Sequence, residues 1–125
     1  MATIVVVEDN PDNMKLFRAV LRRSGHEVRE FATGVGLAAT LAGAKPDLVL
    51  LDIQLPDLDG YEVLGELRAA FGPELRVVAL TAHSLASDRD RVELAGFDGF
   101  ITKPIDVTEF PHQVARAVAG ERIFD

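Results

Sequence analysis

The chain contains no cysteine, which excludes disulfide bonds and thiolate chemistry. No apolar run is long enough to span a membrane, and the first residues lack the basic segment of a secretory signal. Linkers rich in Pro or Ser, internal repeats and low-complexity segments are missing too. Together these absences favour a soluble, cytoplasmic protein that does not act at a membrane.

Positive charge is scarce: 13 Lys and Arg residues stand against 20 Asp and Glu residues, a net charge of −7. This balance argues against a nucleic-acid partner, which requires a basic patch or stripe. A length of 125 residues is enough for one domain with a proper core and too short for two. We therefore expect a single domain over residues 1–125, without an output domain.

The most informative stretch runs from Leu48 to Gly60. Four consecutive aliphatic residues, 48–51, predict a strand buried on both faces, and this strand ends on Asp52. In open α/β sheets the ligand crevice lies outside the carboxyl ends of the strands. Pro56 and the Asp59-Gly60 pair then predict a tight turn that stays near the acid. Taken alone, the stretch is equally compatible with a strand followed by a polar turn.

The rest of the chain alternates between strand and helix patterns, which predicts a doubly wound α/β protein with a five-stranded parallel sheet. Right-handed crossovers and the flavodoxin-like strand order 2-1-3-4-5 are the leading topology. The other predicted strands are 4–7, 27–31, 77–81 and 99–102; the predicted helices are 11–24 with Asn10 as N-cap, 35–41, 60–71, one that begins after Ser84 or Ser87 and ends at Gly96, and 108–119.

Two of these helices have weak signals. The helix after Ser87 has a thin inward face, made of Val92, Ala95 and Leu85. In the last helix Pro111 falls early, so we expect Thr108 rather than Asp106 as the N-cap, which leaves the proline in the tolerated first turn.

In the predicted order the first and third strands are neighbours, so Glu8, Asp9 and Asp52 meet at one place. Three carboxylates that converge on one crevice repel one another strongly. A hard cation relieves this repulsion, and an all-oxygen, acid-rich site suits Mg²⁺.

Thr81 and Lys103 follow the fourth and fifth strands at the same edge of the sheet. An acid cluster, a hydroxyl and an ammonium around one carboxylate describe a phosphoryl-transfer site in which the carboxylate attacks. Each residue alone has an ordinary explanation, as a surface lysine, a strand threonine or a helix-capping acid. Their joint position, each at the end of its own strand, favours the site.

At these residues the chain resembles the receiver domains of two-component response regulators, over essentially its whole length from Ile4 to Ala119. Any one element is weak, but the set is specific. The matching elements are Val7-Glu8-Asp9-Asn10, Leu51-Asp52-Ile53-Gln54-Leu55-Pro56 with Asp59-Gly60, Ala79-Leu80-Thr81-Ala82 and Phe100-Ile101-Thr102-Lys103-Pro104.

The resemblance implies a role for each of these residues. Asp52 is the phosphoacceptor, and it binds Mg²⁺ together with Glu8, Asp9 and the backbone carbonyl of Gln54. Lys103 contacts the phosphoryl group, and its bond to the following proline is cis in this family.

The resemblance also implies a switch. Asp52 takes a phosphoryl group from a phosphohistidine of a histidine kinase or a histidine phosphotransfer protein, and Thr81 moves toward it. Phe100 then turns inward, and the surface formed by the fourth helix, fifth strand and fifth helix changes. The opening Glu8–Leu16 and Asp52–Pro56 look like single-domain cell-cycle regulators of the DivK type and like receivers attached to hybrid histidine kinases. A monomer or a weak, phosphorylation-dependent dimer is expected.

Gln54 and His83 lie two residues after Asp52 and Thr81, where members of this family tune the access of hydrolytic water. We therefore expect this pair to set the phosphoryl lifetime; His83 as a solvated loop residue is the alternative.

Three other functions are compatible with parts of the sequence. Gly34–Ala39 fits the G-x-G-x-x-A pattern of dinucleotide-binding domains, but it follows the second strand and the second half of such a fold is missing. A haloacid-dehalogenase-like phosphatase has a second acid where this chain has Gln54, so turnover of an external substrate is not expected and the protein is not an enzyme in that sense. The third is a pseudo-receiver that binds partners without being phosphorylated.

Overall fold

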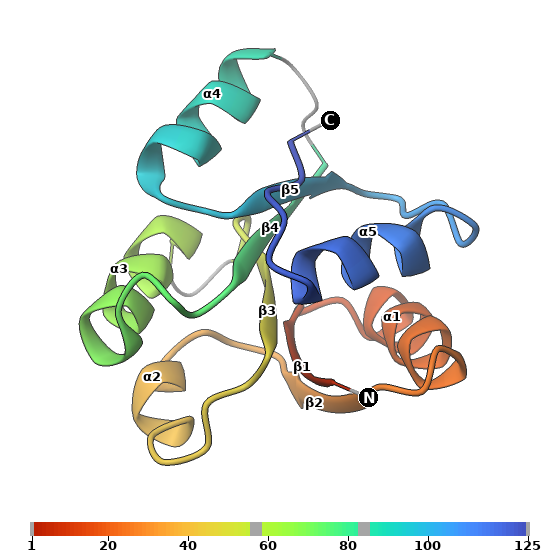
Figure 1. The fold of residues 1–125 in the computed structure, drawn as a ribbon, viewed down its shortest axis with the longest axis horizontal. Helices are drawn as coiled ribbons and strands as arrows, with labels where there is room; N and C mark the ends of the chain where they lie inside the picture. The colour runs from red at the N-terminus through yellow and green to blue at the C-terminus, as the bar shows by residue number, and fades with distance from the viewer. Residues whose placement is uncertain (1, 56–58, 83–85, 125) are drawn as a thin grey trace.

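A computed structural model describes residues 2–55, 59–82 and 86–124. It contains one sheet of five parallel strands in the order β2-β1-β3-β4-β5, which confirms the predicted topology (Figure 1). The strands are β1 Thr3–Val7, β2 Glu27–Phe31, β3 Leu48–Asp52, β4 Val77–Thr81 and β5 Gly99–Thr102; the helices are α1 Pro11–Arg23, α2 Leu37–Thr40, α3 Gly60–Phe71, α4 Ala86–Ala95 and α5 Phe110–Val118.

Helices cover both faces of the sheet, so the core forms two layers (Figure 1). One layer lies between the sheet and helices α1 and α5, around Phe17 and Phe110, whose ring centroids are 5.6 Å apart. The other lies under α2, α3 and α4. The central strands β3 and β4 are buried along their whole length, as expected for strands covered on both faces. Strand β2 is partly exposed, as expected for a strand at the edge of the sheet.

Local sequence determines where α1 and α3 begin. Asn10 Oδ1 accepts the N–H groups of Asp12 (2.9 Å) and Asn13 (3.0 Å), which caps α1 ahead of its first residue, a proline. Asp59 caps α3 in the same way by accepting the Tyr61 N–H at 2.9 Å. Gly60 packs so closely on Ile53 that a Cβ there would collide with the backbone. The start of α3 therefore lies against Ile53, the residue directly after Asp52.

Three helices differ from the predictions at their ends. Helix α2 spans only residues 37–40 of the predicted 35–41. Ser87 lies inside α4 rather than at its cap, while Ser84 and Leu85 lie outside the described residues. Ala95 is exposed, which leaves Val92 as the buried side chain of the inward face that was predicted.

Helix α5 begins at residue 110 rather than after a Thr108 cap. Asp106 Oδ1 accepts the N–H groups of Thr108 (2.8 Å) and Glu109 (3.2 Å), so a short turn leads into the helix. Pro111 still falls in the first turn, as predicted. The prediction of Thr108 as N-cap was wrong because the Asp106 turn already satisfies the backbone N–H groups before the proline.

Arg68 of α3 forms hydrogen bonds with groups near the amino ends of β4 and β5. Its guanidinium donates to the carbonyl oxygens of Gly72 (3.3 Å), Gly96 (2.8 Å) and Leu75, and to Asp98 Oδ2 at 2.9 Å. Asp98 also accepts the Val77 N–H at 2.9 Å. This network connects α3, the start of β4 and the loop between α4 and β5.

Gly34, the first glycine of the dinucleotide-like pattern, packs against Val63 of α3. A Cβ at residue 34 would lie 2.5 Å from Val63 Cγ2, so the packing of the 32–36 loop on α3 explains this glycine without a cofactor. Within the described part of the chain, no helix combines the length and the apolar character that crossing a membrane requires.

Candidate functional site: an acidic cluster beside a lysine

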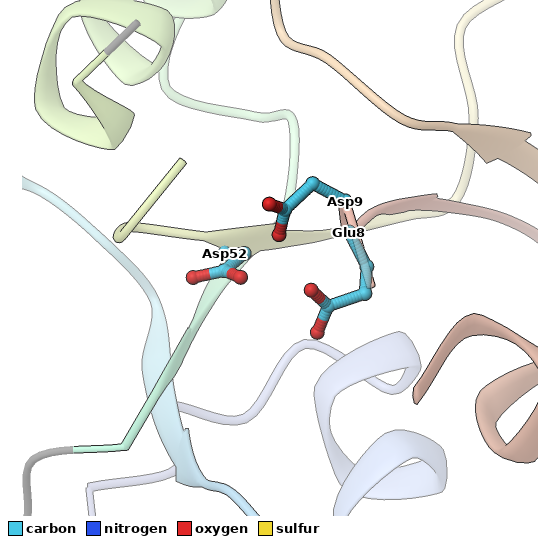
Figure 2. A group of neighbouring side chains, drawn as sticks. All are labelled: Glu8, Asp9 and Asp52. Atoms are coloured by element: carbon cyan, nitrogen blue, oxygen red, sulfur yellow. The ribbon is translucent and has the colours of Figure 1, made fainter. Parts of the chain in front are cut away.

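Three carboxylates meet where β1 and β3 end (Figure 2). The register pairs Val7 of β1 with Leu51 of β3, so the residues that follow, Glu8 and Asp52, lie side by side. One carboxylate oxygen from each of Glu8, Asp9 and Asp52 lies within 4.8 Å of the others. Glu8 and Asp52 are buried, with 2% and 1% of their surface exposed, whereas Asp9 is open to solvent.

Lys103 completes the cluster from the end of β5. Its Nζ lies 2.8 Å from Asp52 Oδ2 and 3.1 Å from Glu8 Oε1. The peptide bond between Lys103 and Pro104 is cis, as the resemblance implied. Thr81 is fully buried at the end of β4, and its carbonyl accepts the Lys103 backbone N–H at 2.7 Å. The structure thus brings together all the strand-end residues predicted for the site.

The pKa values of the two charged partners reflect this crowding. Burial raises the pKa of Glu8 above its ordinary value, and the charge of Asp52 adds to this; the hydrogen bonds from Asn10 and Lys103 act in the opposite direction. Burial alone lowers the pKa of Lys103, but the hydrogen bonds and charges of Asp52 and Glu8 outweigh it, so that the pKa is raised. Lys103 is therefore protonated, whereas ionisation of Glu8 is disfavoured.

Glu8 is also held from α1. The Asn10 backbone N–H lies 3.2 Å from Glu8 Oε2, and Asn13 Nδ2 lies 3.3 Å from Glu8 Oε1. The sequence reasoning gave Asn13 no role. The available signal was its spacing: three residues after the cap of a helix, a side chain in the first turn faces back toward the residues before the helix.

Gln54 connects the loops that follow β3 and β4. Its backbone N–H donates to Asp52 Oδ1 at 2.8 Å, and its side-chain Oε1 accepts the Ala82 N–H at 3.2 Å. The other residue of the predicted lifetime pair, His83, lies outside the described residues, as does Pro56. Phe100 is buried in the core layer that also contains Phe97 and Phe124.

The donor set fits a hard divalent cation. All side-chain ligands on offer are carboxylate oxygens, and two of the three are buried where an uncompensated negative charge is most unfavourable. The single positive charge of Lys103 balances only part of the three negative charges. Oxygen ligands of this kind suit Mg²⁺ rather than the transition metals that prefer nitrogen or sulfur.

A parallel five-stranded α/β fold with acids, a hydroxyl and a lysine at the carboxyl edge defines an aspartate-based phosphoacceptor module. Residues 4–115 match the family model of the response regulator receiver domain. The chain therefore belongs to the response regulator receiver family. Receivers are signalling modules that accept a phosphoryl group and partner histidine kinases in two-component systems, and they are not enzymes that turn over an external substrate.

Individual relatives agree with this membership. The chain is 39% identical over 111 residues to the polar-differentiation response regulator DivK of Brucella anthropi, covering 86% of this chain and 89% of that protein. It is also similar to the receiver domain of the sensor histidine kinase PA1611 of Pseudomonas aeruginosa PAO1, solved with magnesium in its active-site cleft: TM-score 0.85, 33% identity, 95% and 98% of the two chains covered. The receiver domain of DrrB, solved after activation with BeF3, gives a TM-score of 0.83 at 28% identity, with 95% and 98% covered.

Proposed function

We propose that Asp52 is the phosphoacceptor of this receiver and that the phosphoryl donor is a phosphohistidine of a histidine kinase or of a histidine phosphotransfer protein. An oxygen of the Asp52 carboxylate attacks phosphorus, the phosphorus–nitrogen bond breaks, and its electron pair stays with the donor imidazole. The product is an acyl phosphate on Asp52. The observation that carries the proposal is the short contact of Lys103 Nζ with Asp52 Oδ2, at 2.8 Å inside a cluster of three acids.

Each neighbour has a part in this step. Lys103 holds Asp52 in place and then binds an oxygen of the transferred group, and the Thr81 hydroxyl donates to another. Glu8, Asp9, Asp52 and the backbone carbonyl of Gln54 are the proposed ligands of Mg²⁺, which supplies positive charge beside the phosphoryl oxygens.

Two acids of the cluster, Glu8 and Asp9, line a hollow of about 410 Å³ together with Pro11 and Met14, beside the start of α1. We propose that the phosphoryl donor docks over this side of the cluster.

The experiment is intact-mass measurement after incubation with a small phosphodonor, with and without Mg²⁺. We expect a Mg²⁺-dependent gain of one phosphoryl group that is lost in Asp52→Asn. Asp12→Asn is the matched control, because Asp12 is an exposed acid near the cluster that is not part of it. A gain that persists in Asp52→Asn would contradict the assignment. No gain, with Mg²⁺ shown to bind, would make the protein a pseudo-receiver that acts by binding alone.

The switch is the second part of the proposal. Thr81 moves toward the phosphoryl group, the buried Phe100 turns into the space that Thr81 vacates, and the surface of α4, β5 and α5 changes for partner binding or onward transfer. The packing of α4 supports this: among its described side chains, those of residues 87–95, Val92 is the buried one, whereas Leu94 is 87% exposed. An element held by so few apolar contacts moves at low cost. Beryllofluoride, which activated the DrrB receiver, is a suitable stable mimic of the phosphoryl group.

Gln54 and His83 are proposed to set the phosphoryl lifetime. In support, the Gln54 side chain already bridges to the Ala82 N–H, directly beyond Thr81. Dephosphorylation rates of Gln54→Ala, His83→Ala and the double variant test this, and a rate unchanged in all three would refute it.

The location, the oligomeric state and the mode of signalling are part of the proposal as well. The protein works in the cytoplasm as a single receiver domain over residues 1–125. It is a monomer or a weak phosphorylation-dependent dimer, and it signals by protein contact or phosphoryl relay. The net charge of −7 supports a protein partner over a nucleic acid. Sedimentation of the parent protein with and without beryllofluoride tests the oligomeric state.

A further inference from the structure

Residues 121–124, called here the closing segment, pair with the outer edge of β5. The Ile123 N–H donates to the Asp98 carbonyl at 3.0 Å, and the Ile123 carbonyl accepts the Phe100 N–H, also at 3.0 Å. Ile123 and Gly99 form a parallel bridge. Figure 1 shows the chain returning from α5 to lie beside β5, the last strand of the sheet.

The side chains of the closing segment alternate between the two core layers, as those of a strand do. Ile123 belongs to the layer under α1 and α5, and Phe124 belongs to the opposite layer, which also contains Phe97 and Phe100. Both are buried, with 2% and 7% of their surface exposed. Ile123 lies so close to Gly99 that a Cβ at residue 99 would collide with its side chain.

The closing segment also contacts α4. Arg122 lies with its guanidinium carbon 5.1 Å from the centre of the Phe124 ring, and its NH1 is 3.6 Å from Glu93 Oε2. The segment therefore touches both elements that the proposed switch moves: the backbone of Phe100 and the helix α4.

We propose that Ile123 and Phe124 are positioning residues for the phosphoryl switch, holding Phe100 and α4 in the unphosphorylated arrangement until phosphorylation of Asp52 releases them. This inference rests on the proposed function. Phe100 cannot leave its place without disturbing either its backbone bond to Ile123 or the core layer it occupies with Phe124. The link to α4 is a solvent-exposed ion pair, and such pairs are weak. The cost of opening the segment comes mainly from exposing Ile123 and Phe124, and this cost is local, so the segment can open while the sheet stays folded.

Coupling of this kind is reciprocal. If phosphorylation weakens the pairing of the closing segment with β5, that pairing weakens the binding of a phosphoryl mimic such as beryllofluoride by the same factor. The first test is amide hydrogen exchange by NMR with and without beryllofluoride and Mg²⁺. We expect exchange at Phe100 and Ile123 to accelerate on the order of tenfold, a typical allosteric coupling. The Glu27 amide, bound to the Ala2 carbonyl at the opposite edge of the sheet, is the internal control and stays unchanged. Unchanged exchange at Phe100 and Ile123 in the liganded protein would overturn the inference.

The second test measures beryllofluoride affinity. Phe124→Ala is expected to bind it several-fold more tightly than the parent, and Phe124→Leu, which keeps an apolar side chain, to return toward the parent value. Arg122→Gln, which removes only the exposed contacts, gives a smaller change in the same direction and cannot fail by unfolding the core. Parent-like affinity in Phe124→Ala and Arg122→Gln would refute the positioning role. Absence of any beryllofluoride binding by the parent would remove the proposed function and this inference together, whereas binding with unchanged exchange removes only the inference.

Discussion

Replacement of Lys103 by methionine is expected to destabilise the metal-free domain far more than the loss of an ordinary lysine. Lys103 is the ion-pair partner of two carboxylates, Glu8 and Asp52, whose side chains are 0% and 2% exposed. Removing one partner of a buried ion pair costs about 3–5 kcal/mol, because the other charge is left without compensation. Proton uptake by Glu8, whose pKa burial already raises, offsets part of this loss. We expect a net loss of about 3 kcal/mol in the free energy of unfolding near neutral pH.

The matched control is Lys45→Met. Lys45 lies 3.9 Å from Glu74 in an ion pair whose side chains are 45% and 84% exposed. Exposed pairs of this kind contribute about 0–1 kcal/mol. Urea unfolding followed by far-ultraviolet circular dichroism is the appropriate assay, because the chain has no tryptophan and one tyrosine.

The stability loss caused by Lys103→Met is expected to depend on pH through the titration of Glu8. In Lys103→Met the folded-state pKa of Glu8 rises further above its unfolded value. A group with a raised folded pKa contributes stability that is fully present below the unfolded pKa and is lost as pH rises through the folded pKa. The difference between variant and parent is therefore smallest in acid and grows toward neutral pH.

Magnesium is expected to reduce the difference in unfolding free energy between Lys103→Met and the parent. The site without Lys103 has a greater negative charge and therefore binds the cation more tightly. A ligand at a hundred times its dissociation constant adds about 2.7 kcal/mol of stability. The reasoning is refuted if Lys103→Met loses no more stability than Lys45→Met, or if its loss is independent of pH and Mg²⁺.

Three further outcomes are expected. Asn10→Ala removes the cap of α1 and lowers the unfolding free energy by about 1 kcal/mol in urea titrations, whereas Asn10→Asp retains most of it. Asp98→Ala leaves Arg68 without its carboxylate partner and costs about 3 kcal/mol, measured in the same way; a cost below that of Asn10→Ala would contradict the assigned network. Burial lowers the pKa of His26, so its contribution is present above the unfolded pKa and is lost as pH falls through the folded one. His26 Nδ1 accepts the Ala2 N–H at 3.2 Å, and His26→Asn keeps an acceptor there, so this variant is expected to lose less stability than the parent when the pH falls from 7.5 to 5.5.

Most of the sheet and the whole acid cluster follow from local signals. The run before Asp52 is apolar on both faces, and a strand in that environment must end where the first carboxylate occurs. The bounds of α3, Gly60–Phe71, agree with the prediction because a capping Asp and a terminating Gly enclose a clear apolar stripe. Given the strand order, the meeting of Glu8 with Asp52 is a consequence of parallel register.

What the sequence did not reveal depends on contacts between distant residues. The pairing of Ile123 with Gly99 involves too few residues to produce a periodic pattern, so the sequence predicts no strand or helix at the end of the chain. The cap of α5 was misplaced because Asp106 closes a turn ahead of the helix, which the spacing of Pro111 alone does not indicate. Likewise, Ala95 fits the helical period of an inward face, but the sparse packing of α4 leaves it in solvent.

The Arg68 network has a consequence for how α4 can move. Its bonds to Gly96 and Asp98 fix the chain directly after the last residue of α4, so that end is a pivot. Helix α4 has 10 residues and is therefore about 15 Å long at 1.5 Å per residue. A rotation of about 10° around the pivot displaces its first turn by roughly 2–3 Å and displaces its last turn, where Glu93 meets Arg122, by less. In the proposed switch, α4 therefore moves as a lever, with the greatest displacement in its first turn, which begins five residues after Thr81.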